Sequence, residues 1–423
     1  MTPMSYALVD VELSEPAAAV RLEPDQSGLA VVVRWHGRPC GFVTRPFPPG
    51  TTLDAATVGR LADDAGGYQA LVERLRSEVA DGGSGPPLPA VTLAVCTRGR
   101  PDEVARLLGS LAGLEPPVTG VSDLLLVIVD NAPPTGDTRA VVEAFAASAP
   151  EVCGRPLAVR YVVEPLPGLD FARNRALRHA PDGLIVYLDD DVVVERSWLA
   201  GLAEAYAENP DAGAFTGLVL PLALDTEAQV LFERRGGFRK GFAKRRHGAT
   251  VPGDGTYPCG AGVFGTGANM AFRVDLVREL GGFDEALDMG AALPGGGDVD
   301  MFYRVVRSGR TLVYEPSFAV RHEHRRDRAG LRRQFQRSWG MGTTAFAMKL
   351  YATDPEVRPR VRRLLWWWVR HQGRLVRAGI TGRGPVPLDM ALAELWGGLV
   401  GLAGRYPRAQ RLAARIRAEH AGR

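Results

Sequence analysis

The order of apolar and polar positions divides the chain into parts with different patterns. Short apolar runs of the β type fill residues 5–45, and helical spacing of apolar positions takes over from Thr52 to Glu78. Residues 81–89 are dominated by Gly and Pro, which is typical of a linker. We therefore expect a small β-rich N-terminal module over 1–80, a linker over 81–89, a main domain over 90–345 and a helical region over 346–423.

The main domain alternates two patterns. Buried-strand runs of Val, Leu and Ile are each followed by a segment in which apolar residues recur at helical spacing. The predicted strands cover 91–96, 124–129, 158–163 and 184–188, and the predicted helices cover 101–111, 138–147, 169–179 and 198–208. This alternation is typical of βα units, so it predicts an α/β domain with a mainly parallel sheet.

Three carboxylates follow directly on the last of these strands. They are Asp189, Asp190 and Asp191. Adjacent carboxylates repel one another and are costly to desolvate unless a cation approaches them. A solvated turn is the ordinary explanation, but open α/β sheets bind their ligands at the carboxyl ends of strands. We interpret Asp189 and Asp191 as part of a divalent-metal site.

Polar groups also follow the earlier strands. Thr97, Arg98 and Arg100 come after the first strand, Asp130 comes after the second, and Arg173 lies within the third helix. An acid suits hydrogen bonds to a ribose or a base, and Arg suits a diphosphate through bidentate pairing. Each residue alone is explained as a turn or a solvated helix position, but their joint order favours a nucleotide on this side of the sheet.

Later in the chain, two further groups stand out. Residues 295–297 are all Gly and lead into Asp298 and Asp300 at the start of a predicted helix. Either acid would serve as a helix cap, and either could take a proton from a substrate. His322 and His324 are two positions apart on an extended segment, so both side chains point to one face and could approach the metal. A surface histidine is the alternative for each, more strongly for His324.

Composition narrows the partners. The net charge of +3 gives no reason to expect a general polyanion partner, and the Arg-rich C-terminal part lacks an aromatic-basic nucleic-acid motif. The four cysteines are widely spaced, which predicts neither a zinc site nor a disulfide framework. The N-terminus lacks a signal-peptide pattern, and no apolar run reaches the roughly 18 residues of a membrane span. We expect a cytoplasmic protein without a nucleic-acid partner.

One C-terminal segment leaves two interpretations open. Trp366, Trp367 and Trp368 lie in an apolar run that is flanked by six arginines. Aromatic residues with basic flanks are compatible with an interfacial helix at the inner face of the membrane. A helix that packs on the main domain with its arginines outward is an equally good explanation.

From about Pro89 to Gly342, the chain resembles the inverting glycosyltransferases of family 2, which have the Rossmann-like GT-A fold. The resemblance lies in several blocks: Val91-Thr-Leu-Ala-Val-Cys-Thr-Arg-Gly-Arg, Leu126-Val-Ile-Val-Asp-Asn-Ala, Gly168-Leu-Asp-Phe-Ala-Arg-Asn-Arg-Ala-Leu, Leu188-Asp-Asp-Asp, Gly267-Ala-Asn-Met-Ala-Phe-Arg, Gly281-Gly-Phe-Asp-Glu and Gly297-Asp-Val-Asp. The acid cluster corresponds to the DXD motif of that family. Gly297 departs from the pattern, because the family usually has Glu before its catalytic base.

The resemblance implies a hexosyltransferase-type enzyme that moves a sugar from a nucleotide-diphosphate donor to an acceptor hydroxyl with Mn²⁺ or Mg²⁺. It implies metal binding by Asp191, with His322 as a candidate second ligand. Asp298 would be the base, with Asp300 as the alternative. The donor-binding set would be Thr97, Arg98, Arg100, Asp130, Arg173, Asp189 and Asp190, and the acceptor side would hold Asn269 and Asp284. The acceptor would be a glycan, a lipid-linked sugar or a small molecule, as in cell-envelope glycan, glycolipid or secondary-metabolite glycosylation.

Two other functions remain to be weighed. A nucleotidyltransferase can use a similar sheet and metal, but it needs a Gly-rich, Lys-containing loop for a triphosphate, and Thr97-Arg-Gly-Arg-Pro matches this poorly. A non-catalytic sugar-nucleotide-binding protein is the other alternative, and the complete set of acids argues against it.

Overall fold

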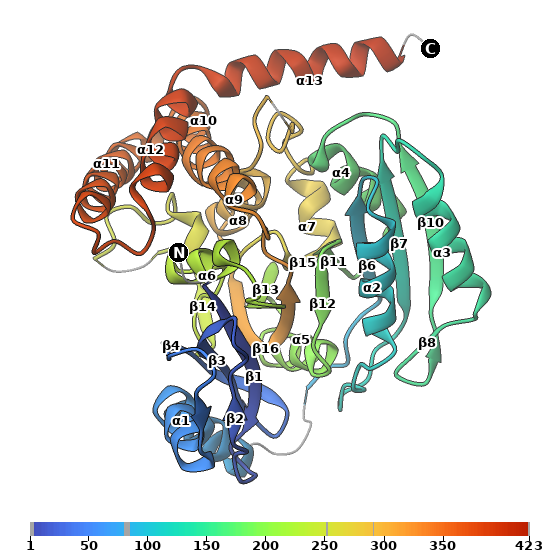
Figure 1. The fold of residues 1–423 in the computed structure, drawn as a ribbon. Helices are drawn as coiled ribbons and strands as arrows, with labels where there is room; N and C mark the ends of the chain where they lie inside the picture. The colour runs from blue at the N-terminus through green and yellow to red at the C-terminus, as the bar shows by residue number, and fades with distance from the viewer. Residues whose placement is uncertain (1–3, 80–84, 251–252, 291, 422–423) are drawn as a thin grey trace.

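The computed structural model describes residues 4–79, 85–250, 253–290 and 292–421. Figure 1 shows a β-rich N-terminal module below a central sheet, with helices of the C-terminal region along one side and across the top. The expected mixed α/β architecture with a helical C-terminal region is confirmed. All four cysteines lie in the described residues and are free thiols.

In the N-terminal module, a small sheet packs on a long helix. Strand β3 (Gln26–Trp35) pairs in parallel with β1 (Ser5–Glu12) and antiparallel with β4 (Arg38–Pro46). Strands β2 (Val20–Arg21) and β5 (Thr52–Leu53) form a short antiparallel ribbon, and α1 (Ala55–Val79) covers the sheet. Valines at alternate positions of β3 and apolar residues of α1 form the core of this module.

Among the described residues, nine strands form the central sheet. Their order is β10 (Ala158–Glu164), β7 (Leu124–Asn131), β6 (Val91–Thr97), β11 (Leu184–Asp189), β15 (Asn269–Arg273), β13 (Ala214–Pro221), β16 (Leu312–His322) and β12 (Val192–Val194), with β14 (Arg245–His247) also paired to β16. The first four are mutually parallel, and β13 is parallel to β16. The predicted, mainly parallel sheet is therefore confirmed.

Helices cover both faces of the sheet, and this explains the continuous apolar strands. Leu184, Val186 and Leu188 of β11 face the core that contains α2 (Pro101–Leu111), α3 (Asp137–Ala147) and α5 (Trp198–Glu208). The residues between them face the opposite core, which contains α4 (Leu169–His179), α7 (Val274–Glu279) and α8 (Gly297–Arg307). A strand that is buried on both sides has no polar face, so its sequence does not alternate.

Strand pairing brings the polar ends of the strands together. Thr97 at the end of β6 pairs with Asp130 at the end of β7, and Asp189 ends β11 beside Cys96. Strand β16 extends to His322, which pairs with Val192 of β12, immediately after the acid cluster. The sheet therefore positions a histidine beside acids that precede it by more than a hundred residues.

The C-terminal region consists of helices that pack on one side of the sheet (Figure 1). Its elements are α9 (Arg328–Gln334), a π-helical segment η2 (Phe335–Gly342), α10 (Thr343–Thr353), α11 (Arg358–Ile380), α12 (Leu388–Leu402) and α13 (Arg405–Ala421). Val361, Leu364 and Trp368 of α11 are buried, whereas Trp366 and Trp367 are exposed. No helix among the described residues combines the length and apolar content that crossing a bilayer requires.

The remaining described elements are short. They are α6 (Glu227–Arg234), the hairpin of β8 (Glu151–Val152) and β9 (Arg155–Pro156), and the turns η1 (Ala261–Val263) and η3 (Pro355–Val357).

Candidate active site

The acid cluster and His322 form one group. Single ligand atoms of Asp189, Asp191 and His322 all lie within 4.8 Å of one another. His322 Nε2 is 3.1 Å from Asp191 Oδ1, an atom that is buried and accepts no hydrogen bond of good geometry from the described residues. A buried carboxylate oxygen without a hydrogen bond, beside a second carboxylate and an imidazole, fits a divalent cation such as Mn²⁺ or Mg²⁺.

The charges in this group are strongly coupled. Burial alone would raise the pKa of Asp191, but the facing His322 and Arg100 lower it below its usual value. Burial and then the charge of Asp191 raise the pKa of Asp189 to about 6. The pKa of His322 is raised, because the attraction of Asp191 outweighs the effect of burial. A cation would relieve the repulsion between the two carboxylates.

Asp190 has a different partner set from its neighbours. Its carboxylate accepts a hydrogen bond of 2.8 Å from Thr97 Oγ1 and is paired with Arg100, whose Nη1 is also 3.1 Å from Asp191 Oδ2. Asp190 and Thr97 are both buried. These two side chains therefore pair with each other, and the donor contacts expected of Asp190 and Thr97 remain predictions. Arg98 is exposed beside them, at the end of β6.

Asp130 is turned inward. It is fully buried, and its Oδ2 accepts a hydrogen bond of 2.8 Å from the Tyr161 hydroxyl. Burial raises the pKa of this carboxyl. The side chain has no exposed surface in this structure, and the donor contact expected of Asp130 remains a prediction.

Arg173 is also buried, and it is neutralised by acids that the sequence did not reveal. Its Nη1 donates to Asp170 Oδ1 at 2.8 Å and to Asp288 Oδ2 at 3.2 Å. Asp170 and Arg173 are three residues apart on one helix, so the sequence could have predicted their pairing. No pattern in the sequence indicates that Asp288 also pairs with Arg173. Arg173 still lines the cleft described below, so a role beside the donor remains a prediction.

The two candidate bases have different surroundings. Asp298 lines the cleft, and its Oδ2 accepts a hydrogen bond of 2.8 Å from the Gly267 amide. Asp300 is fully buried, with Lys349 Nζ at 2.6 Å and Arg304 Nε at 2.8 Å. Asp298 therefore faces the cleft and Asp300 is enclosed, and the choice between them as the base remains a prediction.

The glycine before Asp298 is explained by the same acids. A Cβ atom at Gly297 would collide with the carboxylate of Asp170 and come within 2.6 Å of Asp288 Oδ2. The Gly297 amide also donates to Asp288 at 3.0 Å. Carboxylates from two other segments thus occupy the space that a side chain at position 297 would need.

The two residues expected on the acceptor side, Asn269 and Asp284, have partners within the protein, and their acceptor role remains a prediction. Asn269 is fully buried, where its Oδ1 accepts from Trp198 Nε1 at 3.0 Å and its Nδ2 donates to the Phe318 carbonyl at 2.7 Å. Asp284 accepts from Lys349 Nζ at 2.6 Å and from the Tyr406 hydroxyl at 2.8 Å. Asn269 therefore braces the sheet, and Asp284 ties the C-terminal helices to the main domain.

A cleft of about 590 Å³ lies between the sheet and the C-terminal helices. Its walls include Asp189 and Asp298, a loop with Arg239 and Lys240, and aromatic residues of the C-terminal region, namely Trp339, Trp367 and His371. The indole of Trp367 is stacked on the ring of His371, with centroids 5.1 Å apart. No motif in the sequence singles out Arg239 and Lys240 as wall residues of this cleft.

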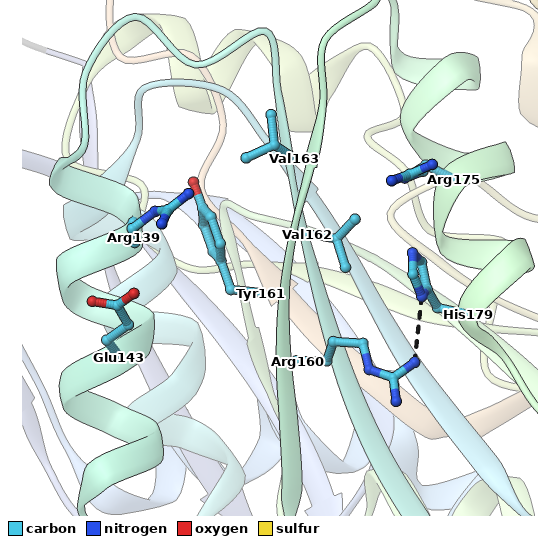
Figure 2. Close-up of a pocket in the computed structure, with 8 residues that line it drawn as sticks. All are labelled: Arg139, Glu143, Arg160, Tyr161, Val162, Val163, Arg175 and His179. Carbon is cyan, nitrogen blue, oxygen red and sulfur yellow. Dashed lines mark hydrogen bonds between the residues drawn. The ribbon is translucent and has the colours of Figure 1, made fainter.

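A second hollow of about 560 Å³ lies on the outer side of the edge strand β10, between α3 and α4 (Figure 2). Figure 2 shows Arg160 joined to His179 and the ring of Tyr161 beside Arg139. Since β7 and β6 separate this edge from β11, the hollow is distinct from the cleft with the acids.

Comparison with known proteins relates the part of the chain that holds the acid cluster to glycosyltransferases. Residues 92–280 match the family model described as "Glycosyl transferase family 2". A pre-mycofactocin glycosyltransferase from Mycobacterium tuberculosis is 25% identical over 244 residues, which are 57% of this chain and 44% of that protein. A glucosyl-dolichyl phosphate glucuronosyltransferase from Haloferax volcanii is 26% identical over 121 residues, 28% of this chain and 34% of that protein. The matches therefore span less than half the length of these relatives.

Among solved structures, a mannosyltransferase from Pyrobaculum calidifontis in complex with GDP-Man and Mn²⁺ aligns with a TM-score of 0.47 and 18% identity. The alignment covers 83% of this chain and 93% of that one. The family match itself includes the acid cluster and ends at Leu280, before Asp298. Residues 92–280 are therefore similar to glycosyl transferase family 2.

Proposed function

We propose that this chain is a metal-dependent, inverting glycosyltransferase that uses a nucleotide-diphosphate sugar as donor. One observation carries the proposal: Asp189 and Asp298 line one cleft, and single ligand atoms of Asp191 and His322 lie within 4.8 Å of Asp189. A nucleotidyltransferase would need a triphosphate-binding loop after β6. At this place Thr97 and Arg100 instead pair with Asp190.

The residues have distinct tasks in this proposal. Asp191 and His322 hold Mn²⁺ or Mg²⁺, which would offset the negative charge that develops on the leaving diphosphate. Asp189, which ends β11 and lines the cleft, orients the donor. Arg98 is exposed and Arg100 is partly exposed just after β6. We assign them to the diphosphate of the donor, because a guanidinium group suits a diphosphate.

Asp298 accepts the proton of the acceptor hydroxyl as that oxygen attacks the anomeric carbon. Its hydrogen bond to the Gly267 amide fixes one carboxylate oxygen, so the direction of the carboxylate is set before substrate arrives. A single displacement from the face opposite the diphosphate inverts the anomeric centre.

The test is a donor screen with purified full-length protein, measuring release of nucleoside diphosphate in the presence of Mn²⁺ or Mg²⁺. We expect release with at least one nucleotide sugar, its loss in chelator, and its loss in Asp191→Asn. Full release in chelator would overturn metal dependence. A binding protein without activity would hold the donor but release no diphosphate with any acceptor offered.

We propose that the acceptor lies against the aromatic wall of the cleft. It would be a glycan, a lipid-linked sugar or a small molecule. Exposed Trp366 and Trp367 on α11 favour delivery from a membrane surface, because exposed arginines surround them: Arg360, Arg362, Arg363, Arg370, Arg374 and Arg377. Trp368 is buried and is left out of this surface.

Changing Trp366 and Trp367 together to Ala should abolish co-sedimentation with anionic vesicles. Unchanged sedimentation of this double variant would remove the membrane contact from the proposal. The matched control is Trp396→Ala, since Trp396 is equally exposed but lies on α12.

A further inference from the structure

His322 has a partner on the side away from Asp191. His324 lies two residues later, and the two Nδ1 atoms are 3.1 Å apart. His324 Nε2 in turn lies 2.8 Å from Oε1 of Glu233, which belongs to α6. All three side chains are buried. A buried chain of polar groups thus runs from the candidate metal ligand to a carboxylate outside the cleft.

When His324 is neutral, the hydrogen-bonding capacity of these groups decides which atom donates in each of the two contacts. A carboxylate can only accept, so His324 Nε2 must donate to Glu233. The Nδ1 atom of a neutral His324 then carries a lone pair, and His322 Nδ1 must donate to it. A neutral His322 is left with its lone pair on Nε2, the atom that faces Asp191.

The surroundings favour a neutral His324. Its ring lies between Phe232 and Phe238, with centroids 4.4 and 5.9 Å away, and such an apolar setting disfavours a charged imidazole. The charge of Glu233 is taken up by an ion pair with Arg239. Phe238 also packs edge-on against His322 at 5.2 Å, which limits rotation of that ring.

We propose that Glu233 and His324 are positioning residues that hold His322 with an unprotonated Nε2 directed at the metal. The inference rests on the metal site of the proposed function and adds the groups that support it. Loss of such an outer partner typically lowers metal affinity by roughly 10–100-fold. Because the chain acts through the His322 tautomer, its effect should be visible in metal binding without any sugar donor.

The experiment is a titration of the full chain with Mn²⁺, followed by electron paramagnetic resonance and by the nitrogen modulation that a ligating imidazole produces. His324→Phe keeps a ring between Phe232 and Phe238 but removes the acceptor for His322. We expect it to weaken Mn²⁺ binding by roughly 10–100-fold and to reduce the nitrogen signal. His324→Gln retains an oxygen acceptor and should lose less affinity.

A role in packing alone predicts the opposite order, because Phe preserves the ring contacts and Gln does not. Glu233→Gln gives a second measurement, since an amide can donate as well as accept and no longer fixes the tautomer. Glu227→Gln on the same helix is the matched control, because Glu227 pairs with Arg328 away from the chain of histidines. It should bind Mn²⁺ like the wild type, and melting in chelator checks that each variant is folded.

Asp191→Asn separates the two levels of the proposal. If Mn²⁺ binding survives in Asp191→Asn, the metal site itself is wrong. If Asp191→Asn abolishes binding while folded His324→Phe and Glu233→Gln bind Mn²⁺ as the wild type does, only the positioning role is overturned.

Discussion

The N-terminal module and the C-terminal helices both pack on the central sheet, but they serve different sides of the site. The module is fixed to the sheet by ion pairs, in which Asp10 and Arg34 meet Glu195 and Arg321. The cleft is lined, in the described chain, by residues from Leu169 to Glu394, so the C-terminal helices contribute to its wall and the module stands behind it.

This difference suggests a division of labour. Arg321 is the neighbour of His322 on β16, and Arg239, which pairs with Glu233, lies 4.1 Å from the ring centre of Phe42 in the module. The module therefore packs behind the group of Asp189, Asp191 and His322. The C-terminal helices supply aromatic surface to the wall of the cleft.

The largest effect is expected from replacing the carboxylate of Asp298 in the cleft. Asp298→Asn should lower the transfer rate by roughly 10²–10⁴-fold, because a general base contributes about that much. Donor and Mn²⁺ affinity should stay near the wild-type values, as measured by calorimetry. Asp300→Asn should instead lower stability with a much smaller rate loss. A reversed result would move the base to Asp300.

The next effect tests the attachment of the module. Glu195→Gln removes one of the two acids that Arg34 and Arg321 share and leaves them Asp10, which should cost roughly 1–3 kcal/mol of unfolding free energy. Urea unfolding measures this loss. The control is Glu115→Gln, whose exposed pair with Arg196 should contribute less than about 0.5 kcal/mol. An unchanged midpoint for Glu195→Gln would refute the structural role of these pairs.

The acceptor side should respond separately. Trp339→Ala removes an aromatic wall of the cleft and should raise the KM for the acceptor by about tenfold, which corresponds to roughly 1.4 kcal/mol. The KM for the donor and the affinity for Mn²⁺ should not change. Trp396→Ala serves as the control outside the cleft. Equal changes in donor and acceptor KM would remove the distinction between the two sides.

The smallest effect concerns pH. Burial would raise the pKa of Asp284, but Lys349 and then Tyr406 lower it overall. Because its folded pKa lies below the unfolded one, Asp284 stabilises the protein fully above the unfolded value of about 3.9, and this contribution is lost as pH falls through the folded pKa. Asp284→Asn should therefore lower the melting temperature by a few degrees at pH 7 and by less near pH 3.5. An equal deficit at both pH values would contradict this.

Local patterns in the sequence were sufficient for the strands and for the acids that end β11, whereas the contact of His322 with these acids depends on strand pairing. A buried strand needs a continuous apolar run, and Asp189 and Asp191 follow such a run directly. The alternation of side chains along an extended segment placed His322 and His324 on one face, and their Nδ1 atoms do meet.

The sequence did not predict the surroundings of residues whose burial depends on distant partners. Asp298 and Asp300 share the first turn of α8, and only the position of Lys349 decides that Asp300 is enclosed. Asn269 was assigned to the acceptor side by its block, although Trp198 and Phe318 hold it in the core. Local pattern cannot report contacts between segments that are far apart in sequence.

The crowded glycine at position 297 has an evolutionary consequence. Since the carboxylates of Asp170 and Asp288 fill the space beside it, a substitution to Glu at this position alone should be rejected. It would become acceptable only together with smaller residues at both 170 and 288, so the three positions are epistatic. Different segments of the chain can thus place negative charge beside Asp298. A search for acids that are adjacent in sequence would miss proteins with this arrangement.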